Sequence, residues 1–296
     1  MNPGIPAGVI DVGSNTVRLL VARFDDARPV PLCTGRVRLG LGAELEQLGR
    51  VSARKLAEAT DAVRSLGALA ARHGLDAPEV LVTAPGRQAV NARELVAALE
   101  RGAQAPVRVL SATEEATLSF YGAVTRAEQS AWPVAVVDLG GASTEIAVGR
   151  PSSGPDWIRS VDLGALRLMT RLLPAERPAS GLIDAARLTV ARAFASVEPP
   201  RPYEALAVGG CARALRKLVG PSLGRDELAG ARARLATSTH GEIVQGYGVD
   251  RRRAPLLLAA TLILADVQER LGVPLQVVDG GLREGALLAS RAGVAA

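Results

Sequence analysis

Two stretches of the chain share one pattern of apolar and polar positions. Residues 9–22 and residues 136–149 each contain an apolar run rich in Val, an Asp, a turn of small residues and a second alternating run. Alternation at every second position is typical of a strand with one buried face, and Gly, Ser and Asn favour tight turns. Each stretch therefore predicts two antiparallel strands joined by a turn, with Asp11 and Asp138 placed just before the two turns.

The rest of the chain alternates between strand-like and helix-like segments. Helical spacing is clearest at 53–72, where Ser52 suits an N-cap and Gly74 follows the end. Other strands are expected at 30–39, 80–83, 107–110, 134–139, 158–162, 205–208 and 275–278. Other helices are expected at 91–101, 112–125, 164–173, 181–196, from 211, at 225–236, 252–271 and 283–290, whereas 38–42 is expected to be a glycine-rich loop. This order predicts an α/β protein with parallel pairing beside the hairpins, and the repeated hairpin predicts two domains.

Composition and charge narrow the class of partner. The chain has 296 residues, 48% of them hydrophobic, which is enough for two domains with their own cores. The net charge of +5 favours an anionic partner, and nearly all of the positive charge is Arg, with Lys only at 55 and 217. Aromatic residues make up 3%, too few for stacking on single-stranded nucleic acid. We therefore expect a small polyanion rather than nucleic acid.

Several features argue against a secreted or membrane protein. The N-terminal residues lack a basic segment before the first strand, and the longest apolar stretch, 254–265, is too short to span a bilayer. Cys33 and Cys211 stand far apart, as expected of reduced thiols. His73 and His240 cannot by themselves build a His/Cys metal site, so any metal should be a hard cation on oxygen ligands. A cytoplasmic protein without a membrane partner is expected.

The repeated turns predict phosphate chemistry. An Asp-x-Gly turn exposes backbone N–H groups to an anion, and its carboxylate can hold a divalent cation against that anion. The alternative is an ordinary hairpin turn, which the same residues suit. One such turn would favour the alternative, but two in register favour a ligand. A third glycine-rich turn, Gly209-Gly210, follows a predicted strand and precedes a helix, which is a place where phosphate commonly binds, with tight packing as the alternative.

Taken in order, these motifs resemble those of the actin, sugar-kinase and heat-shock-chaperone ATPase superfamily. Within it the chain resembles the exopolyphosphatase and guanosine pentaphosphate phosphohydrolase family, Ppx/GppA. The resemblance runs nearly end to end and rests on the residues at 11–16, 36–40, 83–91, 111–116, 138–145, 209–210 and 279–285. Each piece alone is weak, but the combination is specific.

The resemblance implies a fold and an activity. The fold would be two ribonuclease-H-like, actin-like domains flanking a phosphate-binding cleft, the first built from 1–125 plus 283–296 and the second from 126–282. The activity would be Mg²⁺- or Mn²⁺-dependent hydrolysis of the terminal phosphoanhydride bond of inorganic polyphosphate, with release of orthophosphate. The alternative substrate is guanosine pentaphosphate, pppGpp. The oligomeric state is left open, with a homodimer as one option.

Carried over position by position, the resemblance also implies roles for individual residues. Glu115 matches the catalytic acid that activates water, and Arg87 matches an arginine that engages the terminal phosphate. Glu145 matches a further catalytic and metal-binding acid, with Asp138 and Asp11 as the other metal ligands. The expected phosphate-binding residues are Gly13, Ser14, Asn15, Thr16, Gly140, Gly141, Ser143, Thr144, Gly209 and Gly210.

Some interpretations stay open at the level of sequence. Ala142 stands where the family favours a third glycine, and Cys211 where a hydroxyl residue is usual. The run Arg251-Arg252-Arg253 reads either as the solvated start of a long helix or as a guide for polyphosphate, and the first reading is favoured. A sugar or acetate kinase would use the same phosphate turns, and a nucleotide-binding scaffold would keep the glycines without the acid. The presence of Arg87 with Glu115 favours a hydrolase.

Overall fold

The structure is a computed structural model that describes residues 5–25, 28–125 and 132–292. The chain divides into two compact units. The first unit takes the chain up to residue 125 and again from 282, and the second unit takes residues 126–281. The C-terminal segment therefore returns to the unit in which the chain begins.

The first unit is built on a mixed sheet of five strands in the order β3-β2-β1-β4-β5. Its strands are β1 Ala7–Val12, β2 Thr16–Asp25, β3 Arg28–Arg38, β4 Glu79–Val82 and β5 Val107–Val109. The first three strands form an antiparallel meander, whereas β1, β4 and β5 run parallel. The carboxyl ends of the three parallel strands consequently meet at one edge of the sheet.

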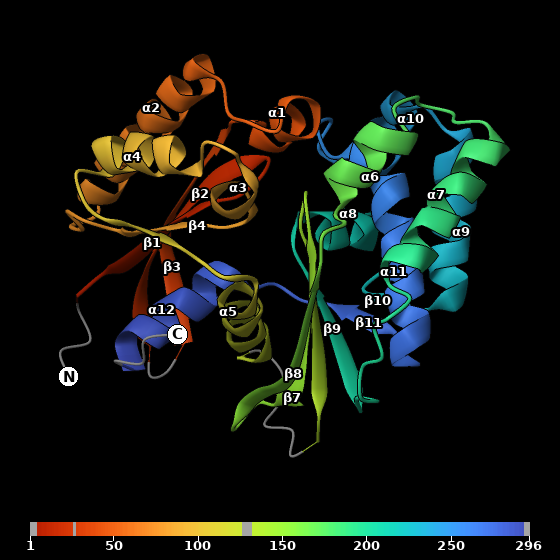
Figure 1. The fold of residues 1–296 in the computed structure, drawn as a ribbon. Coiled ribbons are helices and arrows are strands. Elements are labelled where there is room, and N and C mark those ends of the chain that lie inside the picture. Colours follow the sequence, from red (N-terminus) through yellow and green to blue (C-terminus); the bar gives the residue numbers. More distant parts are fainter. Residues whose placement is uncertain (1–4, 26–27, 126–131, 293–296) are drawn as a thin grey trace. The chain divides into compact units, whose positions relative to one another are not determined.

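Helices cover both faces of this sheet (Figure 1). They are α1 Leu41–Leu48, α2 Ala53–Ala71, α3 Ala84–Gln88, α4 Ala92–Ala103, α5 Ala112–Val124 and α12 Leu282–Ala292. Apolar residues of α2 and α4 pack on one face with Val17 and Leu19, and those of α5 and α12 pack on the other with Val9 and Leu20. The alternation along β2 thus serves two cores, one on each side of the sheet.

The contact between α5 and α12 depends on a glycine. A Cβ at Gly285 would overlap the carbonyl oxygen of Leu118, so only glycine permits this approach of the two helices. Leu282 and Leu287 of α12 complete the small core that also holds Leu118. The C-terminal helix therefore fixes the position of α5, which carries Glu115 in its first turn.

The second unit is built on a mixed sheet of six strands in the order β10-β11-β9-β6-β7-β8. Its strands are β6 Val134–Leu139, β7 Thr144–Arg150, β8 Gly154–Val161, β9 Glu204–Val208, β10 Ser222–Leu223 and β11 Leu275–Val277. Again the first three strands form an antiparallel meander, and β6, β9 and β11 run parallel.

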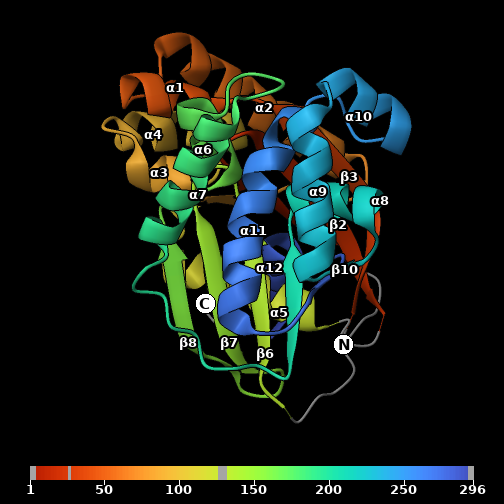
Figure 2. The same ribbon diagram turned by 90° about the vertical axis from the view of Figure 1, so that its right-hand side faces the viewer.

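Helices α7, α9 and α11 lie over the strands of the second sheet (Figure 2). The helices of this unit are α6 Ala165–Leu172, α7 Ser180–Ala193, α8 Gly210–Val219, α9 Arg225–Thr237, α10 His240–Tyr247 and α11 Leu257–Leu271. Helix α11 is the central one, with ten buried residues, and a short 3₁₀ turn, Ala254–Leu256, leads into it. One large apolar core joins these helices to the sheet.

The two hairpins have the same register. In the first, Val12 pairs with Val17 and Asp11 pairs with Arg18, and in the second Leu139 pairs with Thr144 and Asp138 pairs with Glu145. Both turns close with the same hydrogen bond, which Gly13 N–H donates to the Thr16 carbonyl at 3.1 Å and Gly140 N–H to the Ser143 carbonyl at 3.0 Å. The repetition in sequence is therefore a repetition in three dimensions.

The structure confirms the predicted α/β fold class with two mixed sheets. It also adds three helices that the sequence did not predict. Helix α1 occupies part of the segment expected to be a glycine-rich loop, and α3 lies between the predicted strand at 80–83 and the predicted helix at 91–101. Helix α10 begins with a capping box formed by Thr239 and Glu242. In the described ranges, no helix combines the length and apolarity needed to cross a membrane.

Candidate active site

Three predicted site segments of the first unit meet where its parallel strands end. Thr83 N–H donates to the Val12 carbonyl at 3.2 Å, and Leu110 N–H donates to the Val82 carbonyl at 2.9 Å. The turn after β1, the start of α3 after β4 and the start of α5 after β5 are thereby held side by side. Active sites of open α/β sheets form at this edge, beyond the carboxyl ends of the strands.

Arg87 and Glu115 form an ion pair at this edge. Arg87 Nη1 donates to Glu115 Oε2 at 2.9 Å and to the Leu110 carbonyl at 2.7 Å. Side-chain exposures of 21% and 12% make the pair largely buried but not closed off from solvent. Both contacts of Arg87 use Nη1, so Nη2 and Nε of the guanidinium fork are available for an anion.

The backbone of α3 explains the position of Arg87. Pro85 lies in the first turn, where the absence of an N–H is tolerated. A Cβ at Gly86 would lie 2.9 Å from a methyl carbon of Val82 and 3.1 Å from one of Val109, so glycine lets α3 pack directly on β4 and β5. The Pro85-Gly86 sequence thus brings Arg87 close to the strand ends.

The two adjacent acids of α5 have different roles. Glu114 forms a capping box with Ser111, since its carboxylate accepts from Ser111 N–H at 2.7 Å while the Ser111 hydroxyl accepts from Glu114 N–H at 3.1 Å. Partial burial raises the pKa of Glu114, but the hydrogen bonds with Ser111 and the positive charge of Arg108 together hold that pKa below its usual value. Glu115 lies on the buried side of α5 instead. Glu114 therefore caps the helix, and Glu115 is the acid placed with Arg87.

The first glycine-rich turn is fixed by the loop before α1. The Ser14 carbonyl accepts from Gly42 N–H at 2.6 Å, and the Asn15 carbonyl accepts from Gly40 N–H at 3.1 Å. Arg38 Nε donates to Asn15 Oδ1 at 3.2 Å, which turns the amide NH₂ of Asn15 away from Arg38. Thr16 Oγ1 accepts from Arg18 Nε at 3.2 Å. The structure thus holds Asp11 and residues 13–16 in one rigid turn.

The second turn belongs to the other unit and carries two acids. Asp138 and Glu145 are direct cross-strand partners, so their side chains leave the same face of the sheet. Glu145 is buried, and its Oε1 accepts from the Ser160 hydroxyl at 2.8 Å, which orients the carboxylate. Thr144 is fully buried, and its hydroxyl donates to the Leu163 carbonyl at 2.6 Å. That hydroxyl serves the fold, so a phosphate contact at Thr144 would have to come from its backbone.

The third glycine-rich turn lies beside Asp138. Gly209 has a φ of +95°, and a Cβ there would lie 3.2 Å from Asp138 Oδ1 and 3.1 Å from the Leu139 carbonyl. Glycine is thus required both by the backbone and by the nearby carboxylate. The structure places Asp138, Glu145, Gly140, Gly141 and Ser143 with Gly209 and Gly210 at the carboxyl ends of β6 and β9.

Sequence reasoning gave no site role to two residues at these turns and left a third, Arg253, open as part of the run Arg251-Arg252-Arg253. The guanidinium of Arg253 lies against Gly210, and its Nη1 is 3.7 Å from the sulfur of Cys211. Arg253 precedes α11 and bends onto α8, whereas Arg251 and Arg252 are exposed. The other two are Arg18, the cross-strand partner of Asp11, and Ser160, which orients Glu145. Aligning the two hairpins would have placed Arg18 opposite Asp11. The basic run pointed to Arg253 in the sequence, but only the fold separates it from its exposed neighbours Arg251 and Arg252.

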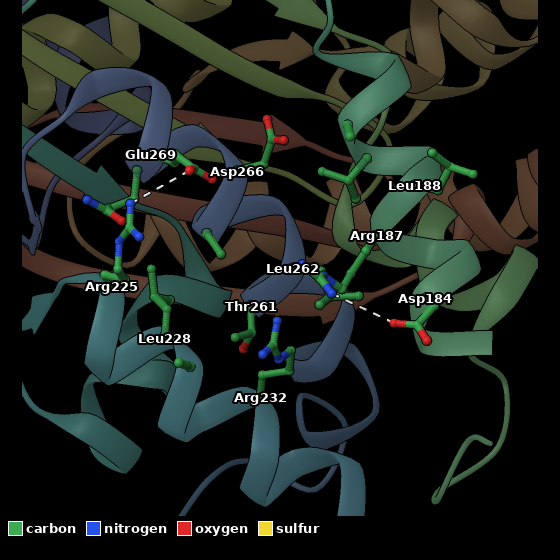
Figure 3. Close-up of a pocket in the computed structure, with 15 residues that line it drawn as sticks. Asp184, Arg187, Leu188, Arg225, Leu228, Arg232, Thr261, Leu262, Asp266 and Glu269 are labelled. Atoms are coloured by element: carbon green, nitrogen blue, oxygen red, sulfur yellow. Dashed lines mark ion pairs between the residues drawn. The ribbon is translucent and has the colours of Figure 1, made fainter. Parts of the chain in front are cut away.

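A pocket of about 660 Å³ lies elsewhere in the second unit, between α7, α9 and α11 (Figure 3). None of the predicted site residues lines it. Its charged rim includes the ion pairs Arg187–Asp184 and Arg225–Glu269, both with N···O distances of 3.7 Å. The pocket is therefore separate from the glycine-rich turns.

Two meanders with Asp-containing hairpins, each continued by parallel strands, define the actin-like class of ATPase folds. The chain belongs to the Ppx/GppA phosphatase family, whose model matches residues 20–292. A family member from Aquifex aeolicus has the same fold, with a TM-score of 0.82 at 23% identity over 98% of each chain. An exopolyphosphatase from Cytophaga hutchinsonii also has a TM-score of 0.82, at 21% identity over 98% of this chain and 99% of that one.

Sequence relatives include named enzymes. An uncharacterized protein of Streptomyces coelicolor is 30% identical over 95% of this chain and 88% of the relative. Exopolyphosphatase 1 of Mycobacterium leprae is 26% identical over the same shares of the two chains. Exopolyphosphatase 2 of Mycobacterium tuberculosis is 33% identical over 61% of this chain and 59% of the relative.

Proposed function

We propose that this chain is a metal-dependent exopolyphosphatase, which hydrolyses the terminal phosphoanhydride bond of inorganic polyphosphate and releases orthophosphate. The observation that carries the proposal is the Arg87–Glu115 pair beside a glycine-rich turn, at the edge where β1, β4 and β5 end. Membership in a phosphatase family and relatives named exopolyphosphatase support it. A binding protein would need the glycines but not this acid.

Each member of the pair has a distinct role in the proposal. The Arg87 fork binds oxygens of the terminal phosphate through Nη2 and Nε and offsets charge that develops in the transition state. Glu115 accepts a proton from the attacking water. The bond from the terminal phosphorus to the bridging oxygen breaks, and the shortened chain leaves with that oxygen. Asn15 and the backbone of the turn at Gly13 position the phosphate.

The acidic residues fit a divalent cation of the magnesium type. Asp138 and Glu145 present carboxylates from neighbouring strands, and Asp11 occupies the equivalent position in the first hairpin. Over the described ranges no three His, Cys, Asp or Glu residues gather into a cage of protein ligands. Mg²⁺ commonly binds through one or two carboxylates together with substrate phosphates, so this donor set suits it. Bound Mg²⁺ or Mn²⁺ would neutralise charge on the transferred group.

We expect the purified protein to release orthophosphate from long-chain polyphosphate in the presence of Mg²⁺ or Mn²⁺. Excess chelator should abolish the release, and added metal should restore it, because the acids alone would repel the phosphate oxygens. A colorimetric phosphate assay over several chain lengths measures this. Undiminished turnover in chelator would contradict the metal requirement.

The same assay with pppGpp distinguishes the alternative substrate. Both molecules present a terminal anhydride, so the chemistry of Arg87 and Glu115 applies to each. A higher kcat/KM for pppGpp than for polyphosphate would make pppGpp the preferred substrate, and the proposed site would stay the same. Release from neither substrate would contradict the proposed hydrolase. That one phosphate chain bridges the turns at Gly13 and Gly140 stays a prediction.

A further inference from the structure

The central strands of the two units carry corresponding rows of side chains with different charge. In the second unit the row across β6, β7 and β8 is Asp138, Glu145 and Ser160. In the first unit the row across β1, β2 and β3 begins with Asp11 and Arg18 and ends with Arg36. The row in the second unit suits a metal ion, whereas the row in the first unit becomes basic with distance from the turn.

The basic row continues on the outermost strand. Arg36 is the cross-strand partner of Arg18, and Arg38 is the partner of Thr16, so all four side chains leave the same face of the sheet. Arg36 and Arg38 are exposed on the edge strand β3, and Arg18 is half-buried between Asp11 and Arg36. Arg38 also contacts Asn15 of the phosphate-binding turn. The row therefore leads from that turn to the edge of the sheet.

Arg18 and Arg36 place two positive charges on directly opposed positions of β2 and β3. Further positive charge is close, since Arg283 Nη1 donates to the Leu19 carbonyl at 3.2 Å. Arg283 is itself 4.0 Å from the carboxylate of Glu284. The geometry on which the subsite rests is the continuous row of basic side chains that begins at the turn and ends on the edge strand.

We propose that Arg36, with Arg38 beside it, forms a distal subsite that binds polyphosphate residues beyond those held by the turn at Gly13. This rests on the proposed function, because it takes the terminal phosphate to lie at that turn. Polyphosphate carries a negative charge at every phosphorus, whereas pppGpp continues as a nucleoside. A basic row beyond the turn consequently favours the polymer and favours long chains over short ones.

A simpler role for these arginines is protection of an edge strand. Charged residues and prolines on edge strands prevent pairing with other chains, and β3 already contains Pro29 and Pro31. If Arg36 only protects the edge strand, replacing it should change the tendency of the protein to associate and leave its binding of polyphosphate unchanged. The two roles therefore differ in what a charge reversal changes.

The test compares Arg36→Glu with Arg23→Glu. Arg23 is also exposed and lies on β2, but its partner in the register is Val30, and its side chain leaves the opposite face of the sheet. Both variants change the net charge equally. Direct binding of long-chain polyphosphate and of tripolyphosphate to each full-length protein is measured by isothermal titration calorimetry at low and high salt.

We expect Arg36→Glu to weaken binding of long-chain polyphosphate roughly tenfold or more at low salt, because a charge-assisted contact is lost and an acid replaces it. Binding of tripolyphosphate should change less than twofold, and Arg23→Glu should bind both like the unmodified protein. Equal losses for both ligands, equal losses for both variants, or no long-chain binding by the unmodified protein would each overturn the subsite. Since binding is measured without turnover, the subsite can stand even if the proposed hydrolysis fails.

Discussion

Glu115→Gln is expected to bind polyphosphate and to lose most of its turnover. The substitution keeps the size of the side chain and a hydrogen bond to Arg87, but it removes the basicity needed to take a proton from water. General-base catalysis typically contributes about 10²–10⁴-fold, so kcat should fall by that factor. Steady-state kinetics with long-chain polyphosphate measure the loss, and calorimetry measures the retained affinity.

Glu114→Gln is the matched control, because the two acids are adjacent in sequence and differ in structure. Successive helix residues point about 100° apart, and Glu114 is engaged with Ser111. We expect this variant to keep kcat within a few-fold, with a small loss of stability from the weakened cap. An inactive Glu114→Gln beside an active Glu115→Gln would reverse the assignment, and two active variants would remove the acid from the mechanism.

Arg87→Ala is expected to reduce both affinity and rate. An arginine that stabilises a transferring phosphoryl group contributes about 10³–10⁵-fold, so kcat/KM should fall by at least roughly 10³. The loss differs in kind from that of Glu115→Gln, since the KM for polyphosphate should rise as well. Comparing kcat and KM of the two variants separates phosphate binding from proton transfer.

Arg93→Ala controls for the loss of a nearby arginine. Arg93 is exposed on α4, a few residues after Arg87, and no carboxylate in the described part of the chain lies within ion-pair distance of it. It should behave like the unmodified protein.

Because Arg87→Ala leaves Glu115 without the partner seen in the structure, Arg87→Lys is the second variant, which keeps the charge and loses the fork. A kcat/KM within tenfold of normal for Arg87→Ala would contradict its proposed role.

The pattern of the sequence predicted the hairpins because strand and turn signals are local. Alternation of apolar residues around Asp11 and Asp138, with glycine at the turns, is sufficient to define both meanders. The capping box of Ser111 and Glu114 is an equally local signal, because its two residues are three positions apart. In the structure Glu114 lies in this box and Glu115 contacts Arg87.

The helices that were missed show where local signals are weak. Helix α1 begins after Gly40 in a left-handed conformation without a side-chain cap and ends at Gly49, so its sequence resembles a loop. Helix α10 had a recognisable signal, Thr239 followed by Glu242 three residues later, but the helix has only eight residues. A helix this short does not contain enough turns for a periodic apolar pattern to be recognised among the surrounding polar residues.

Contacts between distant segments could not be predicted from the sequence. Arg253 reaches Cys211 across 42 residues, and Ser160 reaches Glu145 only because β7 and β8 pair in one register. The resemblance to the family predicted separate roles for Arg87 and Glu115, but the ion pair between them appears only in the structure. Side-chain partners of this kind depend on the tertiary fold. A shift of one residue in the register of a strand would give each side chain a different partner.

Hydrolysis of long-chain polyphosphate in water enriched in oxygen-18 tests the central claim most directly. If water attacks the terminal phosphorus, each released orthophosphate should carry one oxygen from the solvent, and Glu115→Gln should form this labelled product about 10²–10⁴-fold more slowly. Mass spectrometry of the orthophosphate measures this. Transfer of the phosphoryl group to another acceptor without solvent oxygen, or no released orthophosphate with Mg²⁺ present, would contradict the assignment of this chain as an exopolyphosphatase.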